Sequence, residues 1–322
     1  MADYKSFKGF KVRSVASDPT VDEGQMWFNT TSSTLKYDFV GAAAWSSGGA
    51  LNQGRYRGGG GGMGSQTDGM IAGGYSTTYP GSLTQVEQYD GSTWTEGPMA
   101  NLPSVTSDAG QCGTTTASII VGGNSPGVTT DVFEGNGSTW TAGGAYPTAH
   151  ERICVAGTQT ATLAVGGTPP TTNALCFEYD GATWTAGGDY IQTGSNLGIA
   201  GTQNAAIGFD GYGPGGSDST DAGTYDGSTW TEITSTTTAR GEFGWSTQGT
   251  TTDAIATGNP TGNTEKWNGT SWTELANMAS GRNSPFSAGT AAAMFVTGGP
   301  GSQTITENWD DPVYAVKTVT TS

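Results

Sequence analysis

Few residues in this chain carry the chemistry of catalysis or metal binding. It has one histidine, His150, and three cysteines, Cys112, Cys154 and Cys176. The cysteines are odd in number and lack the paired spacing of a metal or redox motif, so we expect inert, partly buried thiols. A lone histidine is more often a surface or interface residue than a base or a metal ligand. These residues therefore predict neither a catalytic site nor a redox cofactor.

The acidic residues leave one alternative open. Asp218, Asp221 and Asp226 are close in sequence and could bind Ca²⁺ through oxygen ligands, although the pattern favours a solvated acidic loop. Glycoside hydrolysis needs two carboxylates that converge on one bond. The other acids occupy repeated turns or isolated loop positions, so no such pair can be nominated. We interpret the chain as a protein that is not an enzyme and that holds no metal or cofactor.

The charge balance limits the partners. The chain has 12 Lys and Arg against 28 Asp and Glu, a formal net charge of −16. A nucleic-acid surface needs clustered cations, so nucleic acid is excluded as a partner. The one basic cluster, which is either a docking arm or a flexible tail, consists of Lys5, Lys8, Lys11 and Arg13. Residues 1–19 lack the apolar segment of a secretory signal, and no apolar run could span a membrane, so we expect a soluble protein without membrane insertion.

The composition indicates an all-β fold. Glycine occupies 54 of the 322 positions, which disfavours long helices, and helical periodicity is absent. Aromatic residues make up 10% of the chain and supply enough apolar surface for a core. We therefore predict a folded protein built from β-strands.

An internal repeat organises the chain. Pairs of glycines recur at a constant separation: Gly64 and Gly73, Gly113 and Gly122, Gly157 and Gly166, Gly249 and Gly258, and Gly289 and Gly298, with Gly201 and Asp210 as a sixth copy. Downstream, an Asp-Gly or Asn-Gly pair precedes a tryptophan in five copies, at Trp94, Trp140, Trp184, Trp230 and Trp272. The tryptophans recur about every 44 residues, a length that suits four short strands per copy.

These repeats predict a six-bladed β-propeller, because a closed ring removes exposed strand edges. Within each copy, the innermost strand leads to the first glycine and the central strand ends at Gly-Gly. The third strand ends before the turn, and the outer strand holds the tryptophan. The Asp-Gly and Asn-Gly pairs predict two-residue hairpin turns. Gly-Gly should let neighbouring strands approach closely, so a bulky residue there should clash.

The sixth copy lacks a tryptophan, so its outer strand must come from elsewhere. The candidates are the C-terminal run Val313–Val319 and the N-terminal segment Ala43–Ser47 around Trp45, and we favour the N-terminal one. The alternating pattern from Met26 to Tyr37 predicts a β-hairpin. The expected domains are an N-terminal arm and hairpin over residues 1–47 and a propeller over residues 48–322.

Short strands followed by Gly-Gly, an aromatic-Asp pair and tryptophan resemble the kelch repeat. Arg152, Arg240 and Arg282 match the arginine often found in that family, and Arg55 and Arg57 could serve the first copy. The resemblance therefore implies a six-bladed kelch-like propeller, preceded by the short arm and hairpin. Copper-radical oxidases on such propellers need two histidine ligands, which excludes their chemistry here. Sialidase aspartate boxes are also excluded, because glycine and tryptophan follow the aspartate one position too early.

A narrower resemblance covers most of the chain. The segments Ala156–Ala161, Tyr225–Thr231 and Phe7–Tyr37 resemble kelch-type repeat proteins of marine tailed phages, particularly cyanophages. Within the leader, Glu23–Thr31 resembles a hairpin module of phage fibre and other virion proteins. The resemblance implies a virion protein, present in several copies per particle, that contacts other virion proteins through its arm and hairpin. A tail or fibre component for host attachment is favoured; the alternatives are a capsid decoration or stabilising protein and a host-type kelch interaction module.

The loops give a candidate binding face. Loops after the central strands and between the copies should share one face, and they carry Tyr75, Tyr79, Tyr146, Tyr190 and Tyr212. Tyrosine offers flat apolar area and a hydroxyl at low entropy cost. These tyrosines are predicted to form a rim that contacts a host-surface glycan or protein. The alternative is that they only pack the loops down.

Overall fold

The structure is a computed structural model that divides the chain into two compact units. It describes residues 12–19, 25–59, 61–78, 81–124, 126–169, 173–259, 261–301, 303–311 and 314–319. Unit 1 comprises residues 1–44 and 311–322, and unit 2 comprises residues 45–310. The C-terminal segment, which we expected in the propeller domain 48–322, therefore belongs with the N-terminal leader. Among the described residues, no helix is long and apolar enough to cross a membrane.

Unit 1 contains the predicted hairpin and completes it into a four-stranded sheet. The hairpin consists of β2 (Met26–Asn29) and β3 (Thr34–Val40), and it is flanked by β1 (Arg13–Val15) and β30 (Tyr314–Thr318) in the order β1-β2-β3-β30. Two strands alone are marginal in water, so the two flanking strands supply the pairing that the hairpin needs. Asp18 ties the sheet together, because its carboxylate accepts hydrogen bonds from Trp27, Asn29 and Lys36.

Unit 2 is built from four-stranded antiparallel sheets, of which its described part holds six. The first three sheets are β5 (Met63–Ser65), β6 (Asp68–Ala72), β9 (Val86–Tyr89) and β10 (Trp94–Glu96); β11 (Gly110–Thr114), β12 (Ala117–Val121), β13 (Val132–Gly135) and β14 (Trp140–Ala142); and β15 (Cys154–Thr158), β16 (Ala161–Val165), β17 (Cys176–Tyr179) and β18 (Trp184–Ala186). The next two are β19 (Gly198–Thr202), β20 (Ala205–Phe209), β21 (Ala222–Tyr225) and β22 (Trp230–Glu232); and β23 (Gly244–Trp245), β24 (Ala254–Thr257), β25 (Thr264–Trp267) and β26 (Trp272–Glu274). The sixth consists of β27 (Phe286–Gly289), β28 (Ala293–Thr297), β29 (Thr306–Asp310) and β4 (Ala44–Ser47). The strand order within each sheet agrees with the prediction from the repeat.

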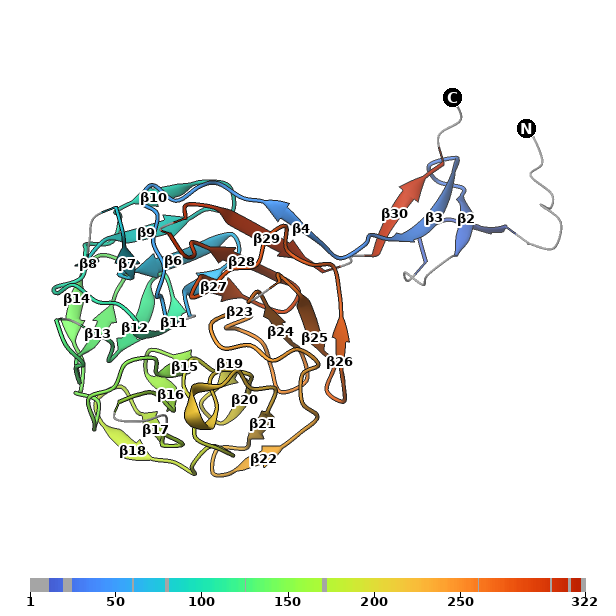
Figure 1. The fold of residues 1–322 in the computed structure, drawn as a ribbon. Coiled ribbons are helices and arrows are strands. Elements are labelled where there is room, and N and C mark those ends of the chain that lie inside the picture. The colour runs from blue at the N-terminus through green and yellow to red at the C-terminus, as the bar shows by residue number, and fades with distance from the viewer. Residues whose placement is uncertain are drawn as a thin grey trace. The chain divides into compact units, whose positions relative to one another are not determined.

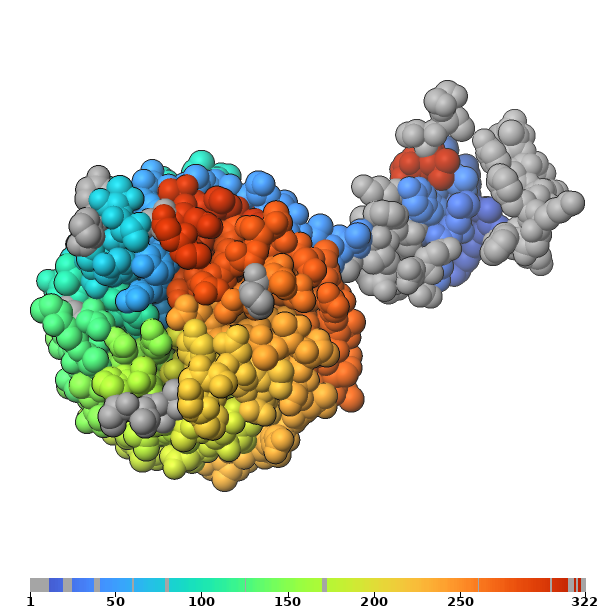
Figure 2. All heavy atoms as spheres, in the orientation of Figure 1, coloured from blue at the N-terminus to red at the C-terminus, as the bar shows by residue number. Residues whose placement is uncertain are grey.

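The six sheets follow one another in chain order around a common axis, so unit 2 is all-β and β-propeller-like (Figure 1). The innermost strands β5, β11, β15, β19, β23 and β27 each contact the next one, and β27 contacts β5. Apolar cores lie between neighbouring sheets; one of them combines Leu163 and Val165 of the third sheet with Ile199 and Tyr225 of the fourth. In the space-filling view the colours run around unit 2 in the same order (Figure 2). A short pair, β7 (Tyr75–Ser76) and β8 (Gly81–Ser82), and a 3-10 turn at Pro214–Gly216 lie in the loops.

The outer strand of the sixth sheet comes from the N-terminal side, as we favoured. β4 lies next to β29, and Trp45 packs against Trp309 with 5.4 Å between the ring centroids. The Trp45 indole donates hydrogen bonds to the Thr264 hydroxyl and to the Ala276 carbonyl. Trp140 and Trp184 donate in the same way to Ala100 and Gly144 on the preceding sheet. Trp45 is therefore the tryptophan that the sixth copy lacks downstream of its own third strand.

The Gly-Gly pairs are close-approach positions, as predicted. Gly122 has φ +63° and Gly166 has φ +68°, a conformation that side chains rarely adopt. A Cβ at Gly122 would lie 2.5 Å from the carbonyl oxygen of His150 on the next sheet. These glycines therefore let each central strand turn against the neighbouring sheet.

The hairpin turns differ from the prediction of two-residue loops. Tyr179 pairs with Trp184, which leaves a four-residue loop, and the Asp180 carboxylate accepts hydrogen bonds from the backbone N–H groups of Ala182 and Thr183. The turns that begin at Asp90, Asn136, Asp226 and Asn268 have the same bonds. An Asx side chain that caps two backbone donors stabilises the wider turn. The glycine is still required, because Gly181 has φ +93°.

Candidate functional site: the axial ring

Six residues at one repeat position surround the axis of unit 2, one ahead of the innermost strand of each sheet; Arg57 lies six residues before β5, and each of the others lies two residues before its strand. We call them the axial ring: Arg57, Asp108, Arg152, Asn196, Glu242 and Ser284. Their backbones are joined in sequence. Arg57 N–H donates to the Ser284 carbonyl at 2.9 Å, Asp108 to Arg57 at 2.8 Å, and Arg152 to Asp108 at 2.6 Å. Asn196 donates to Arg152 at 3.2 Å, and Ser284 to Glu242 at 3.3 Å.

The backbone of this ring is held in an unfavourable conformation. Arg57, Asp108, Arg152, Asn196 and Ser284 have φ values of +59°, +54°, +58°, +50° and +48°. Left-handed backbone costs about 1–2 kcal/mol per non-glycine residue. Glycine would remove this strain, yet none of the five positions is glycine. Strained positions that keep their side chains are typical of functional sites.

Charges of opposite sign alternate along one arc of the ring. The Asp108 carboxylate lies 3.8 Å from the Arg57 guanidinium and 3.9 Å from that of Arg152, which in turn lies 4.0 Å from Glu242. Ser284 donates a hydrogen bond of 2.6 Å to Glu242. The arginine side chains are the more exposed partners, at 42% for Arg57 and 28% for Arg152, against 5% for Asp108 and 19% for Glu242. The charge that the ring presents to solvent is therefore mainly positive.

Several polar groups of the ring have no hydrogen-bond partner among the described residues. Asn196 is 6% exposed and its side-chain amide makes no hydrogen bond there. The Arg152 Nε–H is buried without a partner. The ion pairs of Asp108 exceed hydrogen-bond length. Asp108, Asn196, Glu242 and Ser284 line a small cavity of about 10 Å³, which is room for one water molecule.

Burial shifts the titration of one ring residue, Asp108, toward neutral pH. Burial raises the pKa of Asp108 from 3.8 to about 6, and it outweighs the attraction of Arg57 and Arg152. The negative charges of Glu151 and Glu242 raise this pKa further. The carboxyl group of Asp108 therefore changes charge within the pH range of natural waters and cells.

Two of the five predicted rim tyrosines lie beside the axial ring. The Arg57 guanidinium lies over the Tyr56 and Tyr75 rings, 5.7 and 5.3 Å from their centroids. Tyr212 contacts Glu242, and a Cβ at Gly241 would lie 2.3 Å from its ring. Tyr56, Tyr75 and Tyr212 are each partly exposed. These three tyrosines flank the ring on two sides.

Two of the other rim tyrosines, Tyr146 and Tyr190, are buried. Tyr146 is 2% exposed and packs edge-on against Trp184, and Tyr190 is 4% exposed and packs edge-on against Trp230. Both occupy the repeat position of the buried residues Leu51, Leu102 and Met278, as their shared backbone hydrogen bonds show. The prediction was therefore wrong for these two, because they pack the sheets together. Tyr79 lies outside the described residues.

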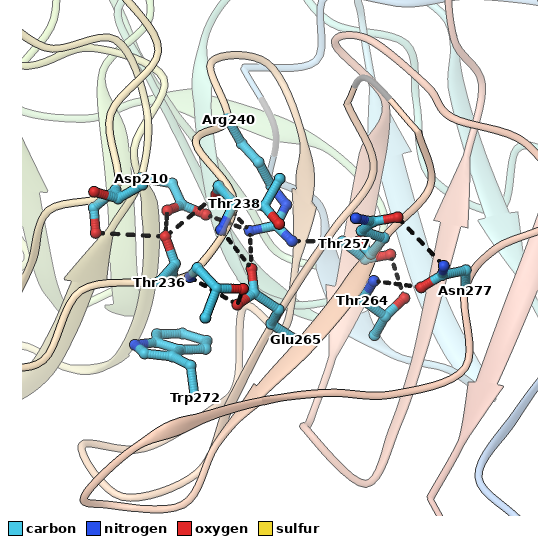
Figure 3. A network of polar contacts seen from close by, with 12 residues as sticks. Asp210, Thr236, Thr238, Arg240, Thr257, Thr264, Glu265, Trp272 and Asn277 are labelled. Carbon is cyan, nitrogen blue, oxygen red and sulfur yellow. Dashed lines mark hydrogen bonds and ion pairs between the residues drawn. The ribbon is translucent and has the colours of Figure 1, made fainter.

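The predicted arginine set combined two different repeat positions. Arg55, Arg240 and Arg282 lie two residues before the axial ring and are buried, whereas Arg152 and Arg57 belong to the ring itself. Arg55 contacts Glu87 at 2.5 Å, Arg240 contacts Glu265 at 2.7 Å, and Arg282 contacts Glu307 at 2.5 Å. Figure 3 shows the Arg240 pair, to which Asp210 adds a second carboxylate at 3.0 Å. The other three sheets have Thr106, His150 or Gly194 in place of the arginine and Phe133, Phe177 or Gly223 in place of the glutamate. The pair is therefore present or absent as a unit.

The remaining candidates have structural environments. His150 is 3% exposed and lies 3.2 Å from the Asn173 amide, and burial lowers its pKa. The three cysteines are free and buried, as predicted, and burial raises the pKa of each to about 12. Asp221 accepts a hydrogen bond from Ser219, and Asp226 caps its turn. No metal-binding group of three or more His, Cys, Asp or Glu residues occurs among the described residues.

The predicted anchoring arm is described only at one residue. Arg13 lies in β1 and is exposed, whereas Lys5, Lys8 and Lys11 fall outside the described residues. The axial ring itself was not predicted. Its six members share a backbone position and no residue type, so a search for repeated side chains does not find them. No protein-family model and no curated protein matches the chain.

Proposed function

We propose that this chain is a non-enzymatic structural protein of a tailed-phage particle, and that the axial ring of unit 2 is its recognition site for the host surface. The observation that carries the proposal is the diversity of the ring. The turns and tryptophans of unit 2 repeat nearly unchanged, whereas the ring has five residue types at six equivalent positions. Five of them keep a side chain in a conformation that favours glycine. A repeat that varies at one end of its axis suits binding to an asymmetric partner.

In this proposal the six sheets are the blades of a kelch-like propeller. The mutual contacts of the innermost strands, and the place of β4 beside β29, support a ring without free edges. The buried arginines Arg55, Arg240 and Arg282 support the likeness to the kelch repeat. Such a rigid body holds the loop face in a fixed geometry, which limits the entropy lost on binding.

Unit 1 is proposed to attach the protein to the particle. Its sheet contains β2 (Met26–Asn29), which is part of the sequence Glu23–Thr31 that resembles a hairpin module of virion proteins. Unit 1 also contains the two chain segments that flank unit 2 in the sequence. This composition suits a base that joins other virion proteins, with the recognition site on unit 2. Several copies per particle and a tail or fibre location follow from the same resemblance.

Localisation in purified particles tests the proposal. Antibodies against unit 2, imaged by electron microscopy on intact phage, should label the tail or its fibres, and mass spectrometry should find the chain in the particles. Regular labelling over the shell would instead support a capsid decoration protein. Absence from particles would contradict a virion role and leave a kelch-type interaction module.

Host attachment needs a separate measurement. Fluorescently labelled full-length protein should bind host cells and compete with phage adsorption. Arg57→Gln should weaken this binding, because it removes the most exposed charge of the ring, whereas Arg13→Gln removes an exposed charge in unit 1 and should not. Equal binding by both variants would show that attachment does not use the axial ring.

A further inference from the structure

The unsatisfied groups of the axial ring define what a ligand must offer. Arg57 and Arg152 each carry five N–H donors, and neither side chain makes a hydrogen bond to the described residues. Asp108 supplies a carboxylate that accepts no hydrogen bond there, and Asn196 supplies an amide that is free both to donate and to accept. All four groups lie on one ring around the axis. A complementary ligand must therefore both accept and donate hydrogen bonds within a small area.

Hydroxyl groups meet this requirement, because each one donates one hydrogen bond and accepts others. An acidic peptide side chain offers acceptors only, and it would give the Asp108 carboxylate no hydrogen-bond donor. A sugar ring carries several hydroxyl groups close together. The mixture of guanidinium, carboxylate and amide groups thus favours a saccharide.

The flanking tyrosines point to the same class. Tyr56 and Tyr75 are partly exposed and meet edge-on, with 5.6 Å between their centroids. Arg57 lies over both rings, which fixes its guanidinium near the axis at low entropy cost. Tyr212 lies on the side of Glu242. Flat apolar rings beside polar groups suit the C–H faces and hydroxyl edges of a sugar.

The positive groups of the ring are more exposed than its negative groups, which favours an anionic sugar over a neutral one. The guanidinium groups are 42% and 28% exposed, whereas the carboxylates of Asp108 and Glu242 are 5% and 19% exposed. A carboxylate on the ligand can reach the arginines without passing the buried acids. Arginine also matches the planar geometry of a carboxylate with two parallel hydrogen bonds.

We propose that the axial ring binds a carboxylate-bearing saccharide, with Arg57 and Arg152 on its carboxylate and Asp108 and Asn196 on its hydroxyls. This inference rests on the proposed function, since it names the chemistry of the host-surface partner. The ligand carboxylate replaces the long ion pairs of the arginines with direct hydrogen bonds. Its hydroxyl groups donate hydrogen bonds to the Asp108 carboxylate, and they donate to and accept from the Asn196 amide. They take the place of the one water molecule for which the cavity has room.

Titration calorimetry on the full-length protein tests the proposal with matched sugars. The probes are glucuronic acid against glucose, galacturonic acid against galactose, and N-acetylneuraminic acid against its methyl ester, together with a short oligoglutamate peptide. At least one acidic sugar should bind at least about tenfold more tightly than its neutral counterpart, as expected for a charged hydrogen-bond pair. Binding of the peptide alone, equal binding of neutral sugars, or no binding by any probe would overturn the proposal.

Two variants of the ring and one control variant separate binding from folding. Arg57→Gln should weaken acidic-sugar binding at least about tenfold, while Arg13→Gln, which removes an exposed arginine of unit 1, should leave it unchanged. Asn196→Gly removes the amide at a position with φ +50°, where glycine is less strained. It should keep or raise the melting temperature and still weaken binding. Unchanged binding by Asn196→Gly would assign that residue a structural role and contradict the proposed contacts.

The two proposals fail independently. A protein that binds an acidic sugar but is absent from phage particles would contradict only the virion role. A protein found on the tail that binds none of the sugars would contradict only this inference.

Discussion

Trp45 and Thr264, which are far apart in the sequence, are joined by a hydrogen bond of 3.0 Å from the indole Nε1 to the hydroxyl. Trp94 makes the equivalent bond of 2.9 Å to Thr306. Each threonine hydroxyl also bonds a second threonine, Thr257 or Thr297, at 2.8 and 2.7 Å. The N-terminal strand therefore repeats, in detail, the contact that links the first sheet to the sixth. It joins the sixth sheet to the fifth.

This contact predicts a measurable role for Trp45 in stability. Trp45→Phe removes the indole donor and part of the ring that packs against Trp309, and should lower the free energy of unfolding by about 1–2 kcal/mol. Trp45→Ala also removes a half-buried ring and should lower it by about 2–3 kcal/mol. Urea unfolding followed by circular dichroism measures both. Trp94→Phe is the matched control and should cost the same as Trp45→Phe; an unchanged Trp45→Phe beside a weakened Trp94→Phe would contradict the equivalence.

The buried Arg282 and Glu307 should behave as a unit. Arg282→Ala leaves the Glu307 carboxylate buried without its cation and should cost about 3–5 kcal/mol. Glu307→Ala should cost a similar amount. Replacing both by apolar residues, as in Arg282→Met with Glu307→Leu, should cost less than the sum of the single changes, because no charge is left unpaired. Chemical unfolding of the parent, the two single variants and the double variant gives a double-mutant cycle. If the losses in free energy of unfolding simply add, the two residues are not coupled.

Asp108 makes stability depend on pH. Its pKa is raised from 3.8 to about 6 in the folded state, so the folded protein holds this proton more tightly than the unfolded chain. Its contribution to stability is therefore fully present below about pH 4 and is lost as the pH rises through 6. Asp108→Asn removes this loss and should raise the free energy of unfolding at pH 7.5, relative to pH 4, by about 2 kcal/mol.

Thermal unfolding of Asp108→Asn across this pH range checks the prediction. Asp131→Asn, an exposed residue of the same sheet region, is the control and should follow the parent protein at every pH. The groups that face Asp108 are Arg57, Arg152, Glu151 and Glu242, and all four remain in the variant. A difference between variant and parent that is the same at pH 4 and pH 7.5 would contradict the raised pKa.

The close approach at the Gly-Gly positions predicts unequal effects of alanine. Gly122→Ala places a methyl group 2.5 Å from the His150 carbonyl oxygen at φ +63° and should cost about 3 kcal/mol or more, from strain and overlap together. Gly215→Ala has φ +78° but open space around its Cβ, so it should cost only the strain of about 1–2 kcal/mol. Denaturant unfolding compares the two. Equal losses would mean that contact with the next sheet is unimportant.

The repeated elements could be predicted from the sequence because their signals are local. Each tryptophan, Gly-Gly pair and Asp-Gly or Asn-Gly turn marks the same strand boundary in every copy, and the strand order followed. The place of β4 in the sixth sheet could also be predicted, because Trp45 supplies the tryptophan that the sixth copy lacks. The turn length could not be predicted from the sequence. It depends on hydrogen bonds that the Asp180 carboxylate accepts from the backbone, and these compete with the tighter hairpin.

The axial ring and the tyrosines needed the structure. Tyr146 and Tyr190 were read as loop residues, although alignment with Leu102 and Met278 would have indicated burial. Arg152 was grouped with Arg240 by type, whereas the two lie two positions apart in the repeat. A ring in which each sheet contributes a different side chain leaves no repeated letter in the sequence. Only the shared backbone geometry identifies it.

The strand pairing also dictates an order of assembly during synthesis. β3 pairs with β30 and β4 pairs with β29, so both partners are translated only after the first five sheets of unit 2. The nascent chain must therefore carry two open strand edges while those five sheets are made. Both edges are covered only when β29 and β30 are made. A ribosome that stalls after β28 would therefore release a chain in which β3 and β4 both lack these partner strands.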